Sequence, residues 1–599
     1  MTESSNQNSP AIDVKAAPAN PSVSASSLPP ELGRIVQQVL KKSGLWRSEK
    51  ADVEAELAAH FADGLASGAS PEQLAKDFGN PKAAAKLIRR GKFRNRPLWW
   101  RTLHRGSQVI FLGLGVAVLY TGFHVLRFYS GEPTIRFNPA ELMNREGLAA
   151  PESARAWQIY RKAVLALDLN AEEQLKIGEV AVSAPSDADF AEIKPLLKRA
   201  QRTLDLTRAA AALPILGYKA SHTGDHEINL HIWEVNGKKG QPPAPEPAEV
   251  AGENPDAIGI IFYHLGQLRQ LARLLRADCY DAIREGDSQR LSSNITALLG
   301  MSVQARKPDS IICSFVAIAI SNIAGDVLRE TLAIRPDLLS DSTLRDLAHR
   351  FAALGAAPDF VSLKGERLFF DDFLQRAYTD DGNGDGRFTS AGALYLAQLG
   401  NYKEPMPPPV YAVSSIVVAG RKQLRDLYHG MLDRAGAEMQ TPPWRLDTNS
   451  PRAGEELDRS ISTPLARARY EAISLLLPAL GHAYRIATNA VMERDATVAS
   501  IAIELYRRRN GQLPASLDDL VPSLLPAIPL DNADGLPLRY HARDGSYILY
   551  SLGADGADAG GVAAANLKDQ SALRGFGRQP QLSAPADWVF FPAEPLQKK

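Results

Sequence analysis

The stretch GSQVIFLGLGVAVLYTGFHVLRF, residues 107–129, decides how this 599-residue chain is organised. It contains no Asp, Glu, Lys or Arg from Val109 to Leu126. With its flanks it reaches the roughly 20 residues that a helix needs to cross ~30 Å of hydrocarbon, and aromatic residues gather at both ends, as they do at membrane interfaces. We therefore expect one transmembrane helix at 107–129. The alternative is a buried helix of a soluble protein.

Basic residues are concentrated on one side of this stretch. The preceding segment contains Lys86, Arg89, Arg90, Lys92, Arg94, Arg96, Arg101 and Arg105, whereas only Arg127 and Arg136 follow closely. Because Lys and Arg beside a membrane helix stay in the cytoplasm, we expect a single-pass protein of the cytoplasmic (inner) membrane. Its N-terminus would be cytoplasmic and its C-terminal region extracytoplasmic. The basic segment also suits anionic lipid headgroups, so the bilayer itself is an expected partner.

The overall composition limits the class of function. Lys plus Arg and Asp plus Glu are both 68, so no excess of positive charge favours nucleic acid, and we expect no such partner. Helical patterning predicts a mainly α fold. It would comprise a small cytoplasmic helical domain, the transmembrane helix, and a large extracytoplasmic, solenoid-like helical region that ends in a small α+β module.

The N-terminal part contains two segments of different character. Residues 1–30 are rich in Ser, Asn, Ala and Pro without periodicity, and we expect them to be disordered. Residues 31–95 have helical patterning, with Ser48 as the expected N-cap of one helix and Ser70, followed by Pro71, as that of the next. This segment resembles the HAAS or permease-prefix domain of bacterial membrane proteins at Glu54, Leu57, His60, Ser70, Pro71, Glu72, Gly79, Asn80 and Pro81. The resemblance implies a cytoplasmic interaction module that regulates or signals to a membrane partner.

Residues 137–460 form the predicted extracytoplasmic helical region. A turn at Gly286 and Asp287 indicates a helical hairpin similar to those of tetratricopeptide repeats, although no fixed period repeats clearly. The clearest helices are expected at 256–284, 289–305, 308–332 and from Val413 to Ala437.

The two cysteines, Cys279 and Cys313, lie on the first and third of these helices. If successive helices are antiparallel, the two residues are offset by about 10 Å along the helix axes. This exceeds the ~7 Å between Cα atoms that a disulfide allows. We therefore expect two buried free thiols.

Residues 461–599 change character after a long helix. The runs PLRYHA and SYILYSLG, separated by Asp-Gly turns, predict that this helix packs on a small antiparallel sheet. The blocks Leu513 to Leu520, Pro529 to Tyr540 and Tyr547 to Gly556 resemble, in this order, the C-terminal part of the major pseudopilins of type II secretion. Pseudopilins carry their hydrophobic helix at the mature N-terminus, so the resemblance implies a borrowed module. The combination of all these parts resembles uncharacterised envelope proteins of Planctomycetes-type bacteria.

The loop TDDGNGDGRFTSAG is the first candidate metal site. Asp381, Asn383 and Asp385 alternate as in the D-x-N-x-D-G start of an EF-hand-type calcium loop. Arg387 would offer its backbone carbonyl. Position twelve is Gly392, so the bidentate Glu of such loops is missing. The alternatives are a weak calcium site and an Asp- and Gly-rich surface turn.

The tail loop SLGADGADAGG is the second candidate. In the pseudopilins that the tail resembles, this loop binds calcium through Asp side chains and backbone carbonyls. The resemblance implies Asp555 as one ligand and Asp558 as another, whereas the family's downstream acidic stretch is absent here. Hard oxygen ligands on a Gly-rich loop suit calcium, and the alternative is a hydrogen-bonded turn.

Catalytic patterns are weak. The segment SHTGDHEINLHIW brings together His222, His226 and His231 without the HExxH spacing of a zinc site, and we expect a polar loop there. We find no nucleophile elbow, phosphate-binding loop or dinucleotide fingerprint. We therefore expect a protein that is not an enzyme and whose extracytoplasmic region binds a protein partner or acts as an envelope scaffold.

Two other functions stay open. One is an extracytoplasmic hydrolase with a dispersed active site, which a concave, charged pocket with converging acid and base groups would favour. The other is an accessory component of an envelope secretion system, which only the tail favours. An extended groove would favour binding instead.

Overall fold

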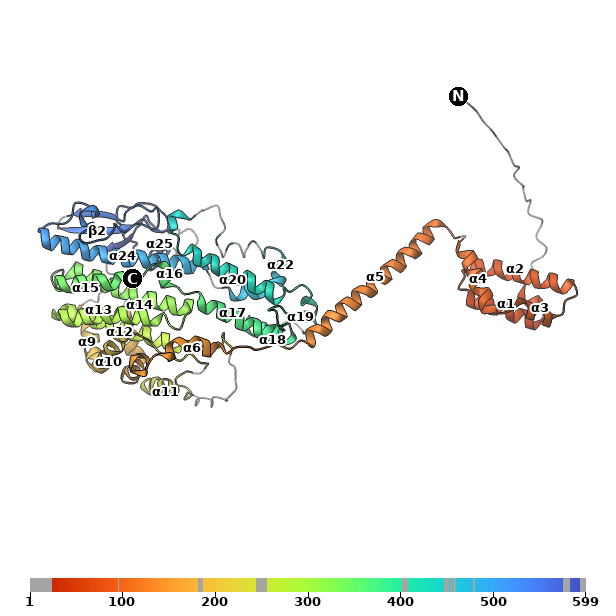
Figure 1. The fold of residues 1–599 in the computed structure, drawn as a ribbon, viewed down its shortest axis with the longest axis horizontal. Coiled ribbons are helices and arrows are strands. Elements are labelled where there is room, and N and C mark those ends of the chain that lie inside the picture. The colour runs from red at the N-terminus through yellow and green to blue at the C-terminus, as the bar shows by residue number, and fades with distance from the viewer. Residues whose placement is uncertain are drawn as a thin grey trace, which may run out of the picture. The chain divides into compact units, whose positions relative to one another are not determined.

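The fold is mainly helical, with a small sheet near the C-terminus, as the sequence predicts (Figure 1). The chain forms two compact units, Met1–Tyr120 and Thr121–Lys599, and each is described by itself. The computed structural model describes residues 24–592 except 95, 181–186, 223, 244–255, 401–407, 447–451, 453–454, 456–458, 460, 478–479, 544 and 575–581.

The first unit consists of short helices followed by the start of a long one. These helices are α1 (Pro30–Ser43), α2 (Arg47–Ala66), α3 (Pro71–Phe78), α4 (Pro81–Arg94) and α5 (Leu98–Tyr129), which continues into the second unit. Buried side chains such as Leu32, Val36 and Phe61 form the core between α1 and α2.

Of the two N-caps predicted for this unit, Ser70 is confirmed and Ser48 is wrong. The Ser70 hydroxyl accepts the amide of Gln73 at 3.3 Å, as expected of the N-cap of α3. Ser48 is not the N-cap of α2, because the helix begins earlier, where the Glu49 carboxylate accepts the amide of Trp46 at 2.9 Å.

The expectation of disorder for residues 1–30 is wrong for the part that the structure describes. Ala25–Ser27 form a 3-10 turn, and the side chains of Ala25 and Leu28 are buried against the core of the first unit. Apolar contact thus orders a stretch whose composition alone indicates disorder. Residues 1–23 lie outside the described residues.

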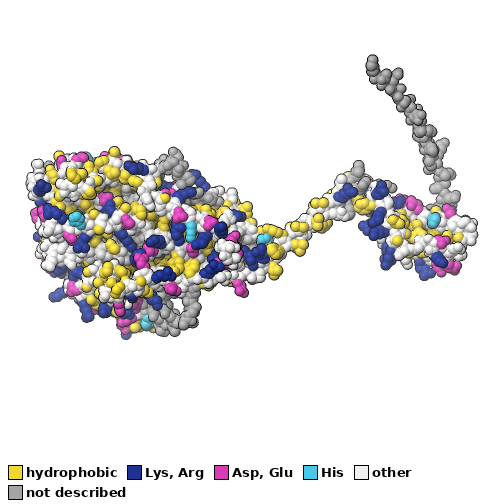
Figure 2. Space-filling model, in the orientation of Figure 1, with side chains coloured by type: hydrophobic (Ala, Val, Ile, Leu, Met, Phe, Trp, Pro, Cys, Tyr) yellow, Lys and Arg dark blue, Asp and Glu magenta, His cyan; other side chains and the backbone are white. Residues whose placement is uncertain are grey.

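Among the described residues, two helices are long and apolar enough to cross a membrane. The first is the Arg105–Tyr129 part of α5, and its apolar window, the 18-residue stretch that meets this criterion, is 0% buried in the protein. The second is α14 (Ile311–Ile334), and 67% of its apolar window is buried. Figure 2 shows hydrophobic side chains along the exposed length of α5.

The second unit is built of helices around one continuous hydrophobic core, which extends from Phe128 to Phe591. In chain order, its helices after α5 are α6 (Pro139–Ala149), α7 (Trp157–Leu165), α8 (Ala171–Val180), α9 (Asp187–Arg199), α10 (Gln201–Ala211), α11 (His226–Val235), α12 (Tyr263–Glu285), α13 (Ser288–Ala305), α14, α15 (Asp341–Ala352), α16 (Ala357–Phe360), α17 (Lys364–Ala377), α18 (Ser390–Leu399), α19 (Pro408–Ser414), α20 (Arg421–Glu438), α22 (Pro464–Arg469), α23 (Glu471–Leu476), α24 (Leu480–Asn510) and α25 (Leu567–Leu573).

Consecutive helices pack on one another in the middle of this unit. The helices expected at 256–284, 289–305 and 308–332 are present as α12, α13 and α14. Gly286 has a φ of +77° and ends α12, so the chain turns directly into α13, against which α12 packs. Further contacts join α10 to α13, α13 to α14, and both α14 and α15 to α24 (Figure 1).

The helix expected from Val413 to Ala437 is wrong at its start. The chain is helical in α19 up to Ser414 and again from Arg421, with Gly420 in an extended conformation as the N-cap of α20. The β-branched run between the two helices disfavours a continuous helix, and Ala419 instead donates its amide to the carbonyl of Arg469 at 3.1 Å.

The C-terminal sheet is antiparallel, in the order β1 (Arg539–Arg543), β2 (Ser546–Ser551) and β3 (Trp588–Phe591). Tyr547 of β2 stacks on Phe591 of β3, with ring centroids 3.9 Å apart. Because α24 packs against β3, the expected long helix on a small antiparallel sheet is confirmed. The third strand is an addition to the two predicted runs.

Candidate functional site

A groove lies between α10, α13 and α15 in the second unit. Its volume is about 490 Å³, which is within the range of ligand pockets. Its lining residues are Arg208, Ala211, Ala212, Gln289, Ser292, Ser293, Thr296, Ala297, Ser342, Thr343, Asp346 and Leu347. Most of these side chains carry a hydroxyl, an amide or a charge. The groove therefore suits a ligand that offers hydrogen-bond donors and acceptors.

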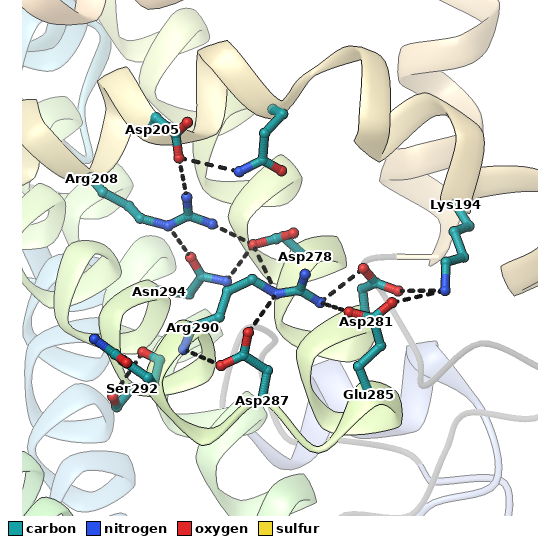
Figure 3. Close-up of polar contacts among 12 residues, drawn as sticks. Lys194, Asp205, Arg208, Asp278, Asp281, Glu285, Asp287, Arg290, Ser292 and Asn294 are labelled. Carbon is teal, nitrogen blue, oxygen red and sulfur yellow. Dashed lines mark hydrogen bonds and ion pairs between the residues drawn. The ribbon is translucent and has the colours of Figure 1, made fainter.

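A buried network of charges holds one wall of the groove (Figure 3). The Arg208 guanidinium donates to Asp278 at 2.5 Å, to Asn294 at 2.7 Å and to Asp205 at 2.7 Å. The Asn294 amide also donates to Asp278 at 2.7 Å, and both of these residues are at most 1% exposed. Since three acceptors hold its guanidinium, Arg208 presents a fixed surface to the groove.

The same network continues toward α9 through a second arginine (Figure 3). Arg290 of α13 pairs with Asp281 at 2.8 Å and with Glu285 at 3.1 Å. Lys194 of α9 donates to Glu285 at 2.9 Å. The charges of Lys194 in the middle of α9, of Asp281 and Glu285 near the end of α12, and of Arg290 near the start of α13 thus compensate one another, which stabilises these helices in one arrangement.

The groove does not have the composition of a hydrolytic site. Asp346 is the only carboxylate among its lining residues, and they include no histidine or cysteine. A second cavity of about 320 Å³ lies beside Trp157 and Tyr218, and its Arg161 is paired with Asp225 and Glu227.

The first Asp-rich loop is closed by its own backbone amides. One Asp381 carboxylate oxygen accepts the amides of Asn383 at 2.8 Å and Asp385 at 3.0 Å. The Asp385 carboxylate accepts the amide of Lys422 at 3.1 Å, which joins the loop to α20. The Arg387 carbonyl, a predicted ligand, accepts the amide of Thr379 at 3.0 Å. These contacts agree with the surface-turn alternative.

Asp380 is a charged partner in this loop that the sequence argument missed. It pairs with Arg421 at 2.7 Å and Arg136 at 2.9 Å. A hydrogen bond from the Gly382 amide, helped by both guanidinium groups, holds the pKa of Asp380 below its usual value. The Asp-Asp doublet was the only signal in the sequence.

The tail loop is arranged in a similar way. The Asp558 carboxylate accepts the amide of Gly560 at 2.8 Å and the hydroxyl of Tyr550 at 3.0 Å, and the amide bond lowers its pKa. Asp555 is exposed and accepts a local amide, that of Ala557 at 3.3 Å.

Asp587 is an acidic residue of this loop that lies outside the predicted set. It precedes β3 and accepts the amides of Ala559 at 3.1 Å and Gly561 at 2.7 Å. Burial raises the pKa of Asp587, and the nearby Asp558 raises it further. The described residues contain no group of three or more His, Cys, Asp or Glu side chains placed to hold a metal ion.

The histidine segment is not the polar loop that we expected, because residues His226–Val235 form α11. Asp225 accepts the amide of Ile228 at 3.1 Å and caps α11, which begins at His226. His222 contacts the carbonyl of Asp256 at 2.7 Å, and His231 contacts that of Leu167 at 3.1 Å. His222 and His231 therefore serve separate backbone contacts.

The cysteines are buried and free, as predicted. Burial raises the pKa of Cys313 to about 12 and raises that of Cys279 as well. Both are therefore thiols at neutral pH and are not nucleophiles.

Comparison of the chain with family models, curated proteins and solved structures gave no match. The groove, the two loops and the helix α5 are therefore interpreted from their own geometry.

One residue of the basic segment before α5 is not available to lipid headgroups. Arg96 is 8% exposed and pairs with Glu49 through two hydrogen bonds of 2.8 and 2.6 Å. Its guanidinium lies 4.3 Å from the ring of Trp46 and 4.2 Å from that of Trp100. We call these contacts of Arg96 with Glu49, Trp46 and Trp100 the Arg96 joint. They hold the start of α5 against α2, because Trp46 directly precedes α2 and Trp100 belongs to α5.

The Arg96 joint predicts a pH-dependent stability of the first unit. Its hydrogen bonds lower the pKa of Glu49, so the joint contributes fully above the unfolded pKa of 4.5 and is lost as the pH falls through the folded value. We expect Glu49→Gln to lower the free energy of opening by about 2 kcal/mol at pH 7. The difference from the wild type should shrink as the pH falls below 4.5 and vanish once the pH lies below the lowered pKa of folded Glu49. Hydrogen exchange over residues 30–100 of the full chain measures this, with Glu54→Gln as the control. An equal effect of Glu49→Gln at pH 7 and at a pH below the pKa of folded Glu49 would contradict this prediction.

Proposed function

We propose that this chain is a single-pass membrane protein, not an enzyme, whose extracytoplasmic region binds a protein partner in the groove between α10, α13 and α15. The groove is the observation that carries the proposal. The small helical unit would act on the cytoplasmic side as a regulatory or localising module. The helical hairpins of the second unit would form a solenoid-like scaffold in the bacterial envelope.

The membrane part of the proposal is supported by the two apolar helices themselves. The apolar window in α14 is mostly buried and has a place in the core of the second unit. The apolar window in α5 is not buried in a protein core, so its Leu and Val side chains would be exposed to water unless lipid covered them. The Lys and Arg residues before α5 favour the orientation with the first unit in the cytoplasm.

The binding part is supported by the chemistry of the groove. An extended polypeptide needs donors and acceptors for its backbone, and the groove supplies hydroxyls from α13 and α15 around the fixed guanidinium of Arg208. The wall that carries Arg208 needs no rearrangement on binding, because the buried network already holds this guanidinium in place.

In-cell photo-crosslinking tests this assignment. A photoreactive amino acid replaces Ser293, which is exposed on α13 inside the groove, or the exposed Ser474 on α23 as a matched control. We expect a specific envelope protein to be crosslinked from position 293 and not from 474. Adding Ser293→Trp to a chain that carries the crosslinker at Thr296 should fill the groove and reduce the yield at least fivefold. Equal crosslinks from both serines, or none from the groove, would contradict the proposal.

We also propose that the two Asp-rich loops bind calcium weakly on the extracytoplasmic side. The first would use Asp381, Asn383, Asp385 and the Arg387 carbonyl, and the second would use Asp555 and Asp558. In each loop, carboxylates that now accept backbone amides would turn oxygen atoms toward the ion.

Thermal melting of the full chain in detergent tests the calcium proposal. Millimolar calcium should raise Tm by about 1–3 °C relative to chelator. Asp381→Asn with Asp385→Asn should remove the part due to the first loop, and Asp555→Asn with Asp558→Asn the part due to the second. Each variant should melt like the wild type in chelator. Identical wild-type curves with calcium and chelator would overturn the proposal for both loops.

A second candidate function is an accessory role in an envelope secretion system. The observation that favours it is the tail, in which α24 leads into the three-stranded sheet in the order of blocks that resembles pseudopilins. Co-purification with secretion proteins would support this role, and recovery of the chain without them would count against it.

A further inference from the structure

We propose that the corner of the second unit formed by α18 and α19 rests on the extracytoplasmic surface of the lipid bilayer. This inference depends on the proposed crossing of the membrane by α5. It adds a lipid-binding surface beyond the crossing itself, on a part of the chain several hundred residues away in sequence.

The first observation is that the end of α5 is held directly against the start of α18. Phe128 of α5 is 2% exposed, and its ring lies 6.2 Å from that of Phe388. The Arg387 side chain donates to the carbonyl of Arg127 at 3.1 Å. A Cβ placed on Gly131 would lie 3.1 Å from the methyl group of Thr389, which caps α18. The chain that leaves α5 is therefore in contact with the N-terminus of α18.

The second observation is an apolar surface on the same corner. Large apolar side chains are exposed at Leu394 of α18 (64%) and at Val410 (46%) and Val413 (53%) of α19. The two valines are three residues apart and share a helix face, and α19 packs on α18. Figure 1 shows both helices at the end of the second unit where α5 enters it. Exposed apolar groups that lie together indicate a covering partner.

The bilayer is the occupant that this position favours. If α5 crosses the membrane, Tyr129 lies at the interface, whose headgroup layer is about 5–8 Å thick on each side. Leu394 is five residues beyond Thr389, which corresponds to about 8 Å along a helix. Leu394 is therefore within about one headgroup-layer thickness of the contact between Gly131 and Thr389. The half-exposed Tyr129 ring and the Arg387 guanidinium, which donates to the carbonyl of Arg127, are groups that interact well with headgroups.

Lipid-borne quenching tests this contact in the full chain. Leu394→Cys and Val413→Cys are labelled with a polarity-sensitive fluorophore and placed in vesicles of phosphatidylcholine and phosphatidylglycerol, with and without a lipid quencher. The native Cys279 and Cys313 are buried and stay unlabelled in the folded protein. Leu114→Cys in α5 is the reference for lipid contact. Ile334→Cys is the matched control, because this side chain is 57% exposed at the far end of α14.

We expect the quencher to reduce fluorescence more than twofold at positions 114, 394 and 413 and by less than a tenth at 334. Quenching at 114 but not at 394 and 413 would overturn the contact and leave the crossing intact. A fluorophore at 394 that is shielded from water but unquenched would mean that protein, such as a second copy, covers the corner, and would also overturn it. Absence of quenching at 114 would overturn the proposed crossing together with the contact.

Discussion

Replacing Asp278 by Ala is expected to lower the free energy of unfolding of the second unit by about 3–5 kcal/mol. The side chain is 1% exposed and accepts hydrogen bonds from both Arg208 and Asn294. Its removal leaves a guanidinium partly buried without its main counter-ion and a buried amide without its acceptor, and each is costly in a low dielectric. Urea unfolding of the full chain in detergent measures the loss.

Asp205→Ala is the matched control, because Asp205 pairs with the same guanidinium at 2.7 Å but its side chain is 63% exposed. It should cost less than about 1 kcal/mol. The Asp278→Ala protein should also lose crosslinking from position 293, because Arg208 is then no longer held at the groove wall. Similar costs for the two alanine variants would show that the network under the groove does not stabilise it as described.

The pair Leu114→Arg and Ala117→Arg is expected to remove the chain from the membrane fraction. The two positions lie three residues apart near the middle of the apolar part of α5, and each charge there costs about 3 kcal/mol on insertion. Together they amount to about 6 kcal/mol, which is roughly a 10⁴-fold change in the insertion equilibrium. Alkaline extraction of membranes measures the fraction that stays inserted.

Ile312→Arg in α14 is the control for this experiment. Ile312 belongs to the other helix that is apolar enough to span a membrane, and its side chain is 57% exposed in the folded second unit. This substitution should leave the membrane fraction unchanged, because α14 belongs to a folded core. Loss of membrane attachment with Ile312→Arg, and not with the α5 pair, would mean that the wrong helix has been assigned.

Much of the secondary structure followed from periodicity and local signals. The helices α12, α13 and α14 have clear apolar faces, and Ser70 followed by Pro71 starts α3 as a cap and first residue should. The two free thiols followed from the helix order alone. These features depend on neighbours close in sequence, so one chain is enough to predict them.

The failures have a common cause in contacts that were not visible locally. The side chain that caps the start of α2 is Glu49 and not Ser48. The Glu49 carboxylate accepts the amide of Trp46 and also binds Arg96. Arg96 itself belonged to a run of basic residues, and only the fold places it between two indole rings. Leu28 looked like part of a disordered tail until a core was available to bury it.

The candidate site was even less visible in the sequence. Ser292, Ser293 and Thr296 on α13 have the spacing of an ordinary solvated helix face, and they become a groove only when α10 and α15 are placed beside them. Asp587 lies far from the tail loop in sequence. It contacts the loop because it directly precedes β3, a strand that the sequence did not predict. Sequence spacing indicated the first Asp-rich loop, and the resemblance of the tail to pseudopilins indicated the second.

The central claim is that α5 separates a cytoplasmic first unit from an extracytoplasmic second unit. Labelling of intact cells with a membrane-impermeant maleimide tests it most directly, using Ala66→Cys at the exposed end of α2 and Ser474→Cys on α23. The account predicts that position 474 reacts in intact cells and that position 66 reacts only after the membrane is permeabilised. Equal reaction of both positions in intact cells, or reaction of position 66 alone, would contradict it.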